Sequence, residues 1–340
     1  MSSQKHPLGE FDLIHRFFKM ESDRMLASYA NSIQLGIGDD CALLMPNAHE
    51  EIAITTDMLV EGRHFLAGAS PTRLGHKALA VNLSDLAAMG AKPLGFTLAI
   101  ALPKSDPLWL EAFSNGLFQL AKEHQCPLIG GDTTAGPLNI CITAFGAVPK
   151  DQAIKRSGAC VGDDIWVSGT VGDARLTLAA LRHELVLTPE ELQAVKARMH
   201  QPNPRVQLGI QLREIASAAL DISDGLLGDL SHILKASQKS ALVYLDRIPK
   251  SATLLKQDAL IQNQYAACGG DDYELCFTAS PRHRQAILGI SQNLNLALSP
   301  IGSIEALVSE IPKITLIDAD GQTLNEEQAV GLLKSFDHFA

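Results

Sequence analysis

Apolar positions along the chain follow two periods, and these predict alternating strands and helices. Apolar residues alternate over 94–102, as in a half-buried strand. Between Ser70 and Gly90 they recur at spacings of three and four instead, as on one face of a helix. Ser70 can cap this helix and Pro71 fits its first turn. The pattern therefore predicts a protein of the α/β (α+β) class.

The same reasoning predicts further elements in both halves of the chain. In the first half they are a strand at 51–56 that stops at Asp57, a helix opened by Asp106 and Pro107, a strand at 127–129 and a strand at 138–148. In the second half they are strands at 164–168, 219–222, 241–245, 273–278 and 300–304, a hairpin over 314–324 that turns at Asp320 and Gly321, and helices after Thr188, over 204–217 and from Gly225 to about Ser237. A polar segment at 149–152 separates the two series and predicts two α/β domains, 1–149 and 150–340.

The composition narrows the classes of function. A net charge of −10 argues against nucleic-acid binding, which needs clustered Lys and Arg. No apolar signal core follows the N-terminus, and no uncharged apolar run approaches the roughly 18 residues of a membrane helix. The 6 cysteines form no CxxC pair, which favours reduced and mostly buried thiols. We therefore expect a cytoplasmic protein with no nucleic-acid or membrane partner.

Aspartates recur beside glycine or small hydroxyl residues, mostly where an apolar stretch ends. Six motifs share this pattern: Gly38-Asp39-Asp40, Thr55-Thr56-Asp57, Ser84-Asp85, Gly130-Gly131-Asp132-Thr133, Asp221-Ile222-Ser223-Asp224-Gly225 and Gly269-Gly270-Asp271-Asp272. A single Asp-Gly pair is common in turns and helix caps. Six such motifs together favour a site where strand ends converge and carboxylates hold Mg²⁺ against a phosphate ligand.

Other designs for phosphate binding are excluded by inspection. The chain has no GxxxxGK[ST] loop, no GxGxxG motif and no HRD with DFG. Several clustered carboxylates would repel one another without a cation, and Mg²⁺ with a polyphosphate would relieve that repulsion. If ATP binds, it is therefore held through metal ions and aspartates rather than by a P-loop lysine.

The motifs resemble those of the thiamine-monophosphate kinase family, within the aminoimidazole-ribonucleotide-synthetase superfamily. The matching segments, in order, are GEFDLIHRFF (9–18), LGIGDDCALL (35–44), TTDMLVEGRHF (55–65), KALAVNLSDLAAMGA (77–91), LIGGDTT (128–134), RSGA (156–159), DISDGLLGDL (221–230), GGDDYELCFT (269–278) and FDHFA (336–340). The resemblance spans nearly the whole chain. It implies the two-domain fold of that superfamily, with the N-terminal sheet pairing across a homodimer.

The resemblance also implies a reaction and a set of site residues. The reaction converts ATP and thiamine monophosphate to ADP and thiamine diphosphate by direct phosphoryl transfer, with several Mg²⁺ ions. The implied metal shell is Asp40, Thr55, Thr56, Asp57, Asp85, Asp132, Asp221 and Asp224. The implied ATP contacts are Gly131, Asp132, Arg156 and Ser223, and the implied substrate contacts are His64, Asp271 and Phe336. Asp57, Asp132 and Arg156 are the expected catalytic residues.

Two positions depart from the family pattern, which often has Glu at Asp271 and Tyr or Trp at Phe336. Both residues keep charge or aromatic character, so the departures affect contact geometry. Two other functions fit the same motifs. One is a related synthetase that uses ATP to activate an amide or another oxygen. The other is a non-catalytic nucleotide or metal sensor on the same scaffold.

Overall fold

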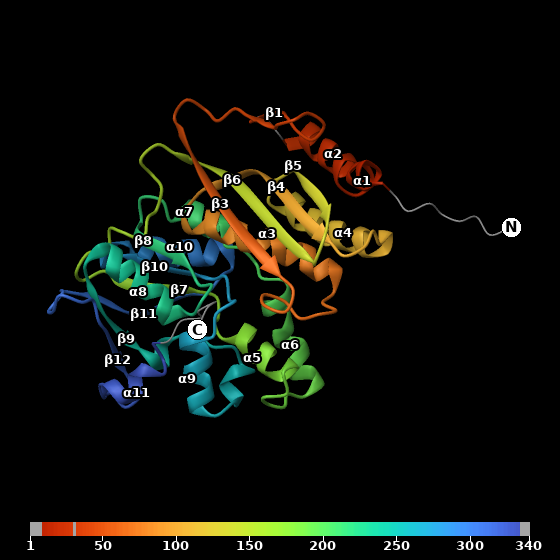
Figure 1. Ribbon diagram of the computed structural model, residues 1–340. Coiled ribbons are helices and arrows are strands. Elements are labelled where there is room, and N and C mark those ends of the chain that lie inside the picture. The colour runs from red at the N-terminus through yellow and green to blue at the C-terminus, as the bar shows by residue number, and fades with distance from the viewer. Residues whose placement is uncertain (1–8, 30–31, 334–340) are drawn as a thin grey trace. The chain divides into compact units, whose positions relative to one another are not determined.

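The computed structural model describes residues 9–29 and 32–333 (Figure 1). The described chain divides into two compact units. The first runs to Leu86 and resumes over Lys92–Lys150, and the second comprises Ala87–Ala91 and the chain from Asp151 onward. Each unit has a β-sheet of its own with helices packed against it. No helix in the described part of the chain combines the length and apolarity needed to cross a membrane.

The first unit is built on a four-stranded sheet. Its elements are α1 (Glu10–Leu13), the π-helix η1 (Ile14–Lys19), α2 (Met20–Tyr29), β1 (Ile33–Leu35), β2 (Leu43–Leu44), β3 (Glu50–Val60), α3 (Pro71–Ala88), β4 (Lys92–Leu102), α4 (Pro107–Glu123), β5 (Leu128–Ala135) and β6 (Asn139–Pro149). The sheet has the order β3-β6-β4-β5, and only the β4–β5 pair is parallel. The short strands β1 and β2 form a separate antiparallel pair.

One face of this sheet is buried and the other is more open. In β6, Ile140 and Ile142 are buried, whereas the alternate residues Cys141 and Thr143 are only partly buried. Alternation of this kind places the buried set on the face that is covered by protein. Helices α3 and α4 pack with their backbones in close approach, because a Cβ at Gly75 or Gly116 would overlap the main chain of the other helix.

The second unit is built on a six-stranded sheet. Its elements are β7 (Asp164–Ser168), α5 (Asp173–Leu181), α6 (Pro189–His200), α7 (Val206–Gln211), β8 (Ala216–Asp221), α8 (Leu226–Ser237), β9 (Ser240–Tyr244), η2 (Leu245–Arg247), η3 (Leu254–Lys256), α9 (Ala259–Cys268), β10 (Leu275–Ala279), η4 (Pro281–His283), α10 (Arg284–Leu294), β11 (Leu298–Glu305), β12 (Ile314–Ile317) and α11 (Glu326–Val330). The order is β12-β9-β11-β7-β10-β8, and the pairs are antiparallel except β12 with β9. Strands β7 and β10 are buried at every position, which fits their central places.

Most predicted elements are confirmed, but two strands extend further than their apolar runs. Strand β3 continues past Asp57 because all 11 of its residues pair with β6. Strand β5 continues through Gly130 to Ala135 along β4. The prediction that Asp57 and Asp132 lie where strands end is therefore wrong. Ladder hydrogen bonds, rather than the hydrophobic run, decide where these strands stop.

Two predictions in the second unit also need correction. The helix expected over 204–217 ends at Gln211, because residues 216–221 pair with β10 as strand β8. The hairpin expected over 314–324 has one regular arm, β12. Its other arm contributes a single bridge, between Ile317 and Thr323. In both places, pairing with a strand distant in sequence overrides local propensity.

Candidate functional site

Strand β3 and helix α3 bring three of the predicted residues into one neighbourhood. The Thr55 hydroxyl donates a hydrogen bond to a carboxylate oxygen of Asp85, in the last turn of α3. Asp85 is partly exposed, whereas Leu83, Ser84 and Leu86 around it are buried. Asp57 follows Thr55 by two residues on β3, so its side chain projects from the same face of the strand. This arrangement gathers hydroxyl and carboxylate oxygens, the donors that Mg²⁺ prefers.

The electrostatic surroundings of these residues fit a cationic ligand. Burial raises the pKa of the Cys141 thiol, and the negative charge of nearby Asp57 raises it further. Asn82, one turn before Asp85 in α3, is fully buried and donates its side-chain amide to the Ala78 carbonyl. Its Oδ1 atom has no hydrogen-bond partner among the described residues. A buried acceptor in this state fits a ligand that supplies a donor or a cation.

Thr56 points the other way from Thr55, as alternation along a strand requires. Its hydroxyl lies 2.9 Å from the hydroxyl of Thr143, the paired residue on β6. Thr56 is exposed and Thr143 is partly buried, so both belong to the more open face of the sheet. Thr55 and Thr56 therefore do not contact one ligand from the same side of β3.

Gly131 and Asp132 lie on β5, at the opposite edge of the sheet from β3. Gly131 has φ +145°, and a Cβ there would overlap the Leu98 carbonyl of β4, so only glycine fits. Asp132 pairs with Ala99, and both residues are exposed. One row of paired residues crosses the sheet from Asp57 on β3, through β6 and β4, to Gly131 on β5.

The two expected catalytic aspartates are consequently far apart within the first unit. Three strand spacings separate Asp57 from the strand of Asp132, which is about 14 Å. A magnesium ion with ligand distances of about 2.1 Å cannot join carboxylates on these two backbone positions. The prediction that the acids fold into one pocket does not hold for this pair of residues within the unit.

Asp40 and His64 lie in turns of the first unit. Asp40 is exposed, and its backbone N–H donates to the Asp39 carboxylate at 2.9 Å. His64 is partly buried and its Nδ1 atom accepts from the Val60 N–H at 3.0 Å. In the neutral imidazole the proton is therefore on Nε2, which can donate to an anionic ligand.

In the second unit, two of the predicted acidic motifs meet. The Asp271 N–H donates to the Ser223 carbonyl at 2.7 Å, and the Tyr273 N–H donates to the Ile222 carbonyl at 2.8 Å. Asp271 and Tyr273 have φ of 64° and 52°, a conformation that costs energy in residues other than glycine. These backbone bonds hold that conformation. Backbone hydrogen bonds thus join residues 221–225 to residues 269–273, which are distant in sequence.

Buried charged side chains within the 269–274 loop anchor it to neighbouring segments. Both carboxylate oxygens of Asp272 accept the Gly172 N–H, each at 3.0 Å, and burial raises the pKa of Asp272. Glu274 is fully buried and binds the Arg205 guanidinium through both of its oxygens. Arg198 donates to the same carboxylate. This network holds the loop that presents Asp271.

Helix α8 follows the Asp221–Gly225 segment and contacts a second predicted motif. At its start, the Asp229 carboxylate accepts the N–H groups of Ser223, Asp224 and Gly225 at 3.1, 3.0 and 3.1 Å. At its end, the Ser237 hydroxyl donates to the Arg156 carbonyl at 3.3 Å. The helix thereby links the segment of Asp224 with the segment of Arg156.

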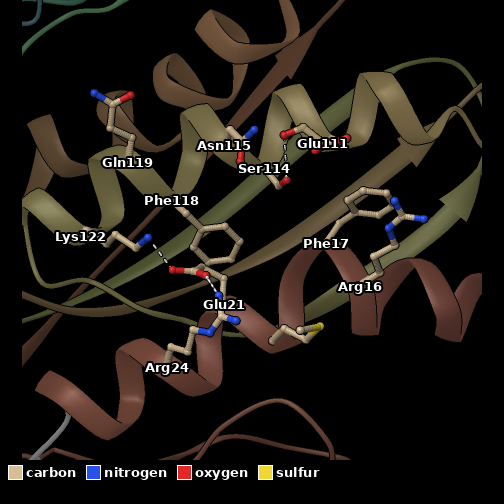
Figure 2. Close-up of a pocket in the computed structure, with 11 residues that line it drawn as sticks. Arg16, Phe17, Glu21, Arg24, Glu111, Ser114, Asn115, Phe118, Gln119 and Lys122 are labelled. Atoms are coloured by element: carbon tan, nitrogen blue, oxygen red, sulfur yellow. Dashed lines mark hydrogen bonds and ion pairs between the residues drawn. The ribbon is translucent and has the colours of Figure 1, made fainter.

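A groove of about 450 Å³ lies elsewhere in the first unit, between the N-terminal helices and α4 (Figure 2). Three cationic residues, Arg16, Arg24 and Lys122, line it, and Glu21 pairs with two of them. Figure 2 shows Glu21 between Arg24 and Lys122, with Phe17 and Phe118 as apolar walls. None of the predicted site residues lines this groove.

Among the described residues, no three His, Cys, Asp or Glu side chains gather at metal-binding spacing. The predicted metal shell thus stays a prediction, and its members belong to two units. Phe336, the predicted aromatic contact, lies outside the described residues.

Two family descriptions match the chain in succession. "AIR synthase related protein, N-terminal domain" matches residues 38–148, and the C-terminal domain of the same description matches residues 161–311. The curated thiamine-monophosphate kinase of Salmonella typhimurium is 44% identical over 334 residues, which cover 98% of each chain. The chain belongs to the thiamine-monophosphate kinase family.

Solved structures from this family share the fold. The crystal structure of thiamine-monophosphate kinase from Stenotrophomonas maltophilia has a TM-score of 0.83 and 42% identity, covering 93% of this chain and 98% of that one. AaThiL complexed with AMPPCP and TMP has a TM-score of 0.73 and 27% identity, covering 99% and 100%. The resemblance and the two-domain fold predicted from it are therefore confirmed. Pairing of the N-terminal sheets across a dimer stays a prediction.

Several residues that support the predicted site of this thiamine-monophosphate kinase family member were not predicted from the sequence. Asp229 lies in the quoted DISDGLLGDL motif, and an acid in the first turn of a helix is a signal that could have marked it. Glu274 lies in GGDDYELCFT, but nothing in the sequence links it to Arg198 or Arg205. Ser237 carries no sequence signal. Its role follows only from the chain segments that packing brings to the end of α8.

Proposed function

We propose that this chain transfers the terminal phosphoryl group of ATP to the phosphate of thiamine monophosphate, giving ADP and thiamine diphosphate. The observation that carries the proposal is 44% identity to a curated thiamine-monophosphate kinase over 98% of both chains. The structure of AaThiL with AMPPCP and TMP supports the same pair of substrates. Function depends on the residues of a site rather than on the fold alone. Similarity over the full length of both chains includes the site residues, and it therefore favours the same substrates.

The proposed magnesium ligands come from both units. They are Asp40, Thr55, Thr56, Asp57, Asp85, Asp132, Asp221 and Asp224. The Thr55–Asp85 contact and the unpaired Asn82 oxygen support the part of this set on β3 and α3. Asp57 and Asp132 lie on the two opposite edge strands of the sheet, β3 and β5. When bound, magnesium offsets the repulsion between the two phosphate groups that must meet.

The remaining residues position two anions rather than activate a nucleophile. The acceptor phosphate is already ionised near neutral pH, so the reaction needs no strong general base. We assign ATP contacts to Gly131, Asp132 and Ser223, and neutralisation of the transferring group to Arg156. We assign substrate contacts to His64, Asp271 and Phe336. The bond from Val60 to Nδ1 puts the proton of the neutral His64 ring on Nε2, which supports the assignment of His64 to an anionic substrate.

We also propose a homodimer formed through the open face of the β3-β6-β4-β5 sheet. Ile54 and Met58 on β3 are 63% and 53% exposed, and Ile54 pairs with Phe145 on β6. Large apolar side chains gathered on an open sheet face favour burial against a partner. Ile54→Glu is expected to lower the mass measured by light scattering to that of a monomer. An unchanged dimer mass for this variant would refute the interface.

We also propose a cytoplasmic location, because the proposed reaction consumes ATP. A coupled assay of ADP release tests the function itself. We expect release that requires both thiamine monophosphate and Mg²⁺, and a fall of orders of magnitude in Asp57→Asn and Asp132→Asn with unchanged circular dichroism. Near-normal turnover in both variants would defeat the site assignment.

The same assay separates the two alternative functions. ADP release with an amide-bearing substrate, and none with thiamine monophosphate, would favour a synthetase. ATP binding without turnover of any substrate would favour a sensor. Full-length similarity to thiamine-monophosphate kinases favours neither.

A further inference from the structure

Helix α8 makes side-chain contacts at both ends with segments that carry proposed site residues. The Asp221–Gly225 segment enters its first turn, and the Arg156–Ala159 segment lies against its last turn. The two α8 residues that make these contacts, Asp229 and Ser237, do not belong to the proposed catalytic or binding set. Both use a side chain of α8 to hold backbone groups of an irregular segment.

At the start of α8, the Asp229 carboxylate accepts three backbone hydrogen bonds. A single oxygen of Asp229, Oδ2, accepts the N–H groups of Ser223, Asp224 and Gly225. Asp229 is only 4% exposed, so water competes little with these N–H donors for its carboxylate oxygen. Successive N–H groups that converge on one oxygen fix the φ and ψ angles of the residues that carry them. The direction of the Asp224 side chain therefore depends on Asp229.

The contact at the end of the helix uses a hydroxyl as both donor and acceptor. The Ser237 hydroxyl accepts the N–H groups of Gly158 and Ala159, each at 3.2 Å, and donates to the Arg156 carbonyl. Gly158 has φ +127°, and a Cβ there would overlap the Ser217 carbonyl. The segment after Arg156 is thus pinned on both sides, by Ser237 and by strand β8.

His232, midway along α8, feels charges from both segments. Burial lowers the pKa of His232, and the positive charges of Arg156 and Lys235 lower it further, whereas Asp224 opposes them. Arg156 and Asp224 therefore both lie within electrostatic reach of one side chain.

We propose that Asp229 and Ser237 are positioning residues, which hold the Asp224 and Arg156 segments at the two ends of α8 in a fixed mutual arrangement for phosphoryl transfer. Their effect on catalysis rests on the proposed function. Their effect on the two segments does not, and this difference makes the two ideas separable by experiment.

Hydrogen exchange of the full chain without ligands tests the structural half of the proposal. In Asp229→Ala the amides of Ser223, Asp224 and Gly225 should exchange about five- to tenfold faster, because each loses its acceptor. In Ser237→Ala the same change is expected at Gly158 and Ala159 and not at residues 223–225. Unchanged exchange at these amides would overturn the proposal.

Steady-state kinetics test the catalytic half. A misplaced group can lower turnover on the order of tenfold to a hundredfold, and we expect this of Asp229→Ala. Asp229→Asn keeps an acceptor oxygen and should recover most of the loss in both exchange and kcat. A residue that served stability alone would show a lower melting temperature with no such recovery of kcat.

Two variants serve as matched controls. Asp106 caps α4 by accepting the N–H groups of Leu108 and Trp109, on a helix with no proposed site residue, so Asp106→Ala removes a comparable cap. Ser231→Ala removes a hydroxyl from α8 that makes no hydrogen bond with the described residues. Both should keep wild-type kcat and wild-type exchange at residues 156–159 and 223–225.

The outcomes distinguish failure of the proposal from failure of the proposed function. Faster exchange with wild-type kcat in Asp229→Ala and Ser237→Ala would refute the positioning role while the kinase activity stands. Absence of thiamine monophosphate phosphorylation in the wild-type chain would refute the proposed function. The exchange results would then still decide whether Asp229 and Ser237 order the two segments.

Discussion

Removing the Glu274 carboxylate should destabilise the second unit strongly. Glu274 is fully buried and binds Arg198, Arg205 and Ser168, so Glu274→Ala leaves two guanidinium groups without their shared partner. Breaking a buried ion pair from one side costs about 3–5 kcal/mol. The two arginine side chains keep 20% and 14% exposure, which partly hydrates them. We therefore expect the lower end, about 3 kcal/mol.

Thermal unfolding followed by circular dichroism measures this cost. The second unit has about 195 residues, and at that size each kcal/mol corresponds to about 2–4 °C. Glu274→Ala should therefore lower the melting temperature by at least about 6 °C. Glu184→Ala is the matched control, because its ion pair with Arg175 is 37% and 27% exposed and should contribute less than about 1 kcal/mol.

A third variant identifies the source of the cost. Replacing Glu274, Arg198 and Arg205 together by apolar residues of similar volume removes the stranded charges, and should restore most of the lost stability. A melting temperature for Glu274→Ala within about 2 °C of wild type would refute the reasoning. So would a triple variant as unstable as the single one, because the loss would then come from packing.

Two other perturbations probe the first unit. Gly131→Ala places a Cβ against the Leu98 carbonyl at φ +145° and should cost at least about 1 kcal/mol in urea unfolding, whereas Gly289→Ala, in α10 with open space around it, should be neutral or stabilising; equal stability of the two variants would contradict this. Burial lowers the pKa of His124 below 6.5, so the unfolded chain binds the proton first, and stability should fall as pH drops through 6.5. Urea unfolding at pH 5 and pH 8 should show this loss in the wild type and less of it in His124→Gln, and an identical pH dependence in both would count against it.

The periodic parts of the chain were predictable without a structure. The strand over 94–102 and the helix after Ser70 lie where their apolar periods and caps put them, because burial of one face dominates such segments. The capping box at Thr188 and Glu191 forms as its sequence predicts. Local chemistry alone decides these elements.

The extent of β3 and β5 was not predictable, because the residues that prolong them are polar. Thr56, Asp57 and Asp132 stay in strands since β6 and β4 complete their backbone hydrogen bonds, and those partners are distant in sequence.

The sequence by itself determined the family, the acidic chemistry and most of the regular elements, because each is written in short motifs and local periods. Only the tertiary structure decided which acids are neighbours. It joined Thr55 to Asp85, set Asp57 and Asp132 at opposite sheet edges, and brought Arg156 to the end of α8. Strand order and helix packing fix these relations, and both depend on contacts between residues that no local pattern connects.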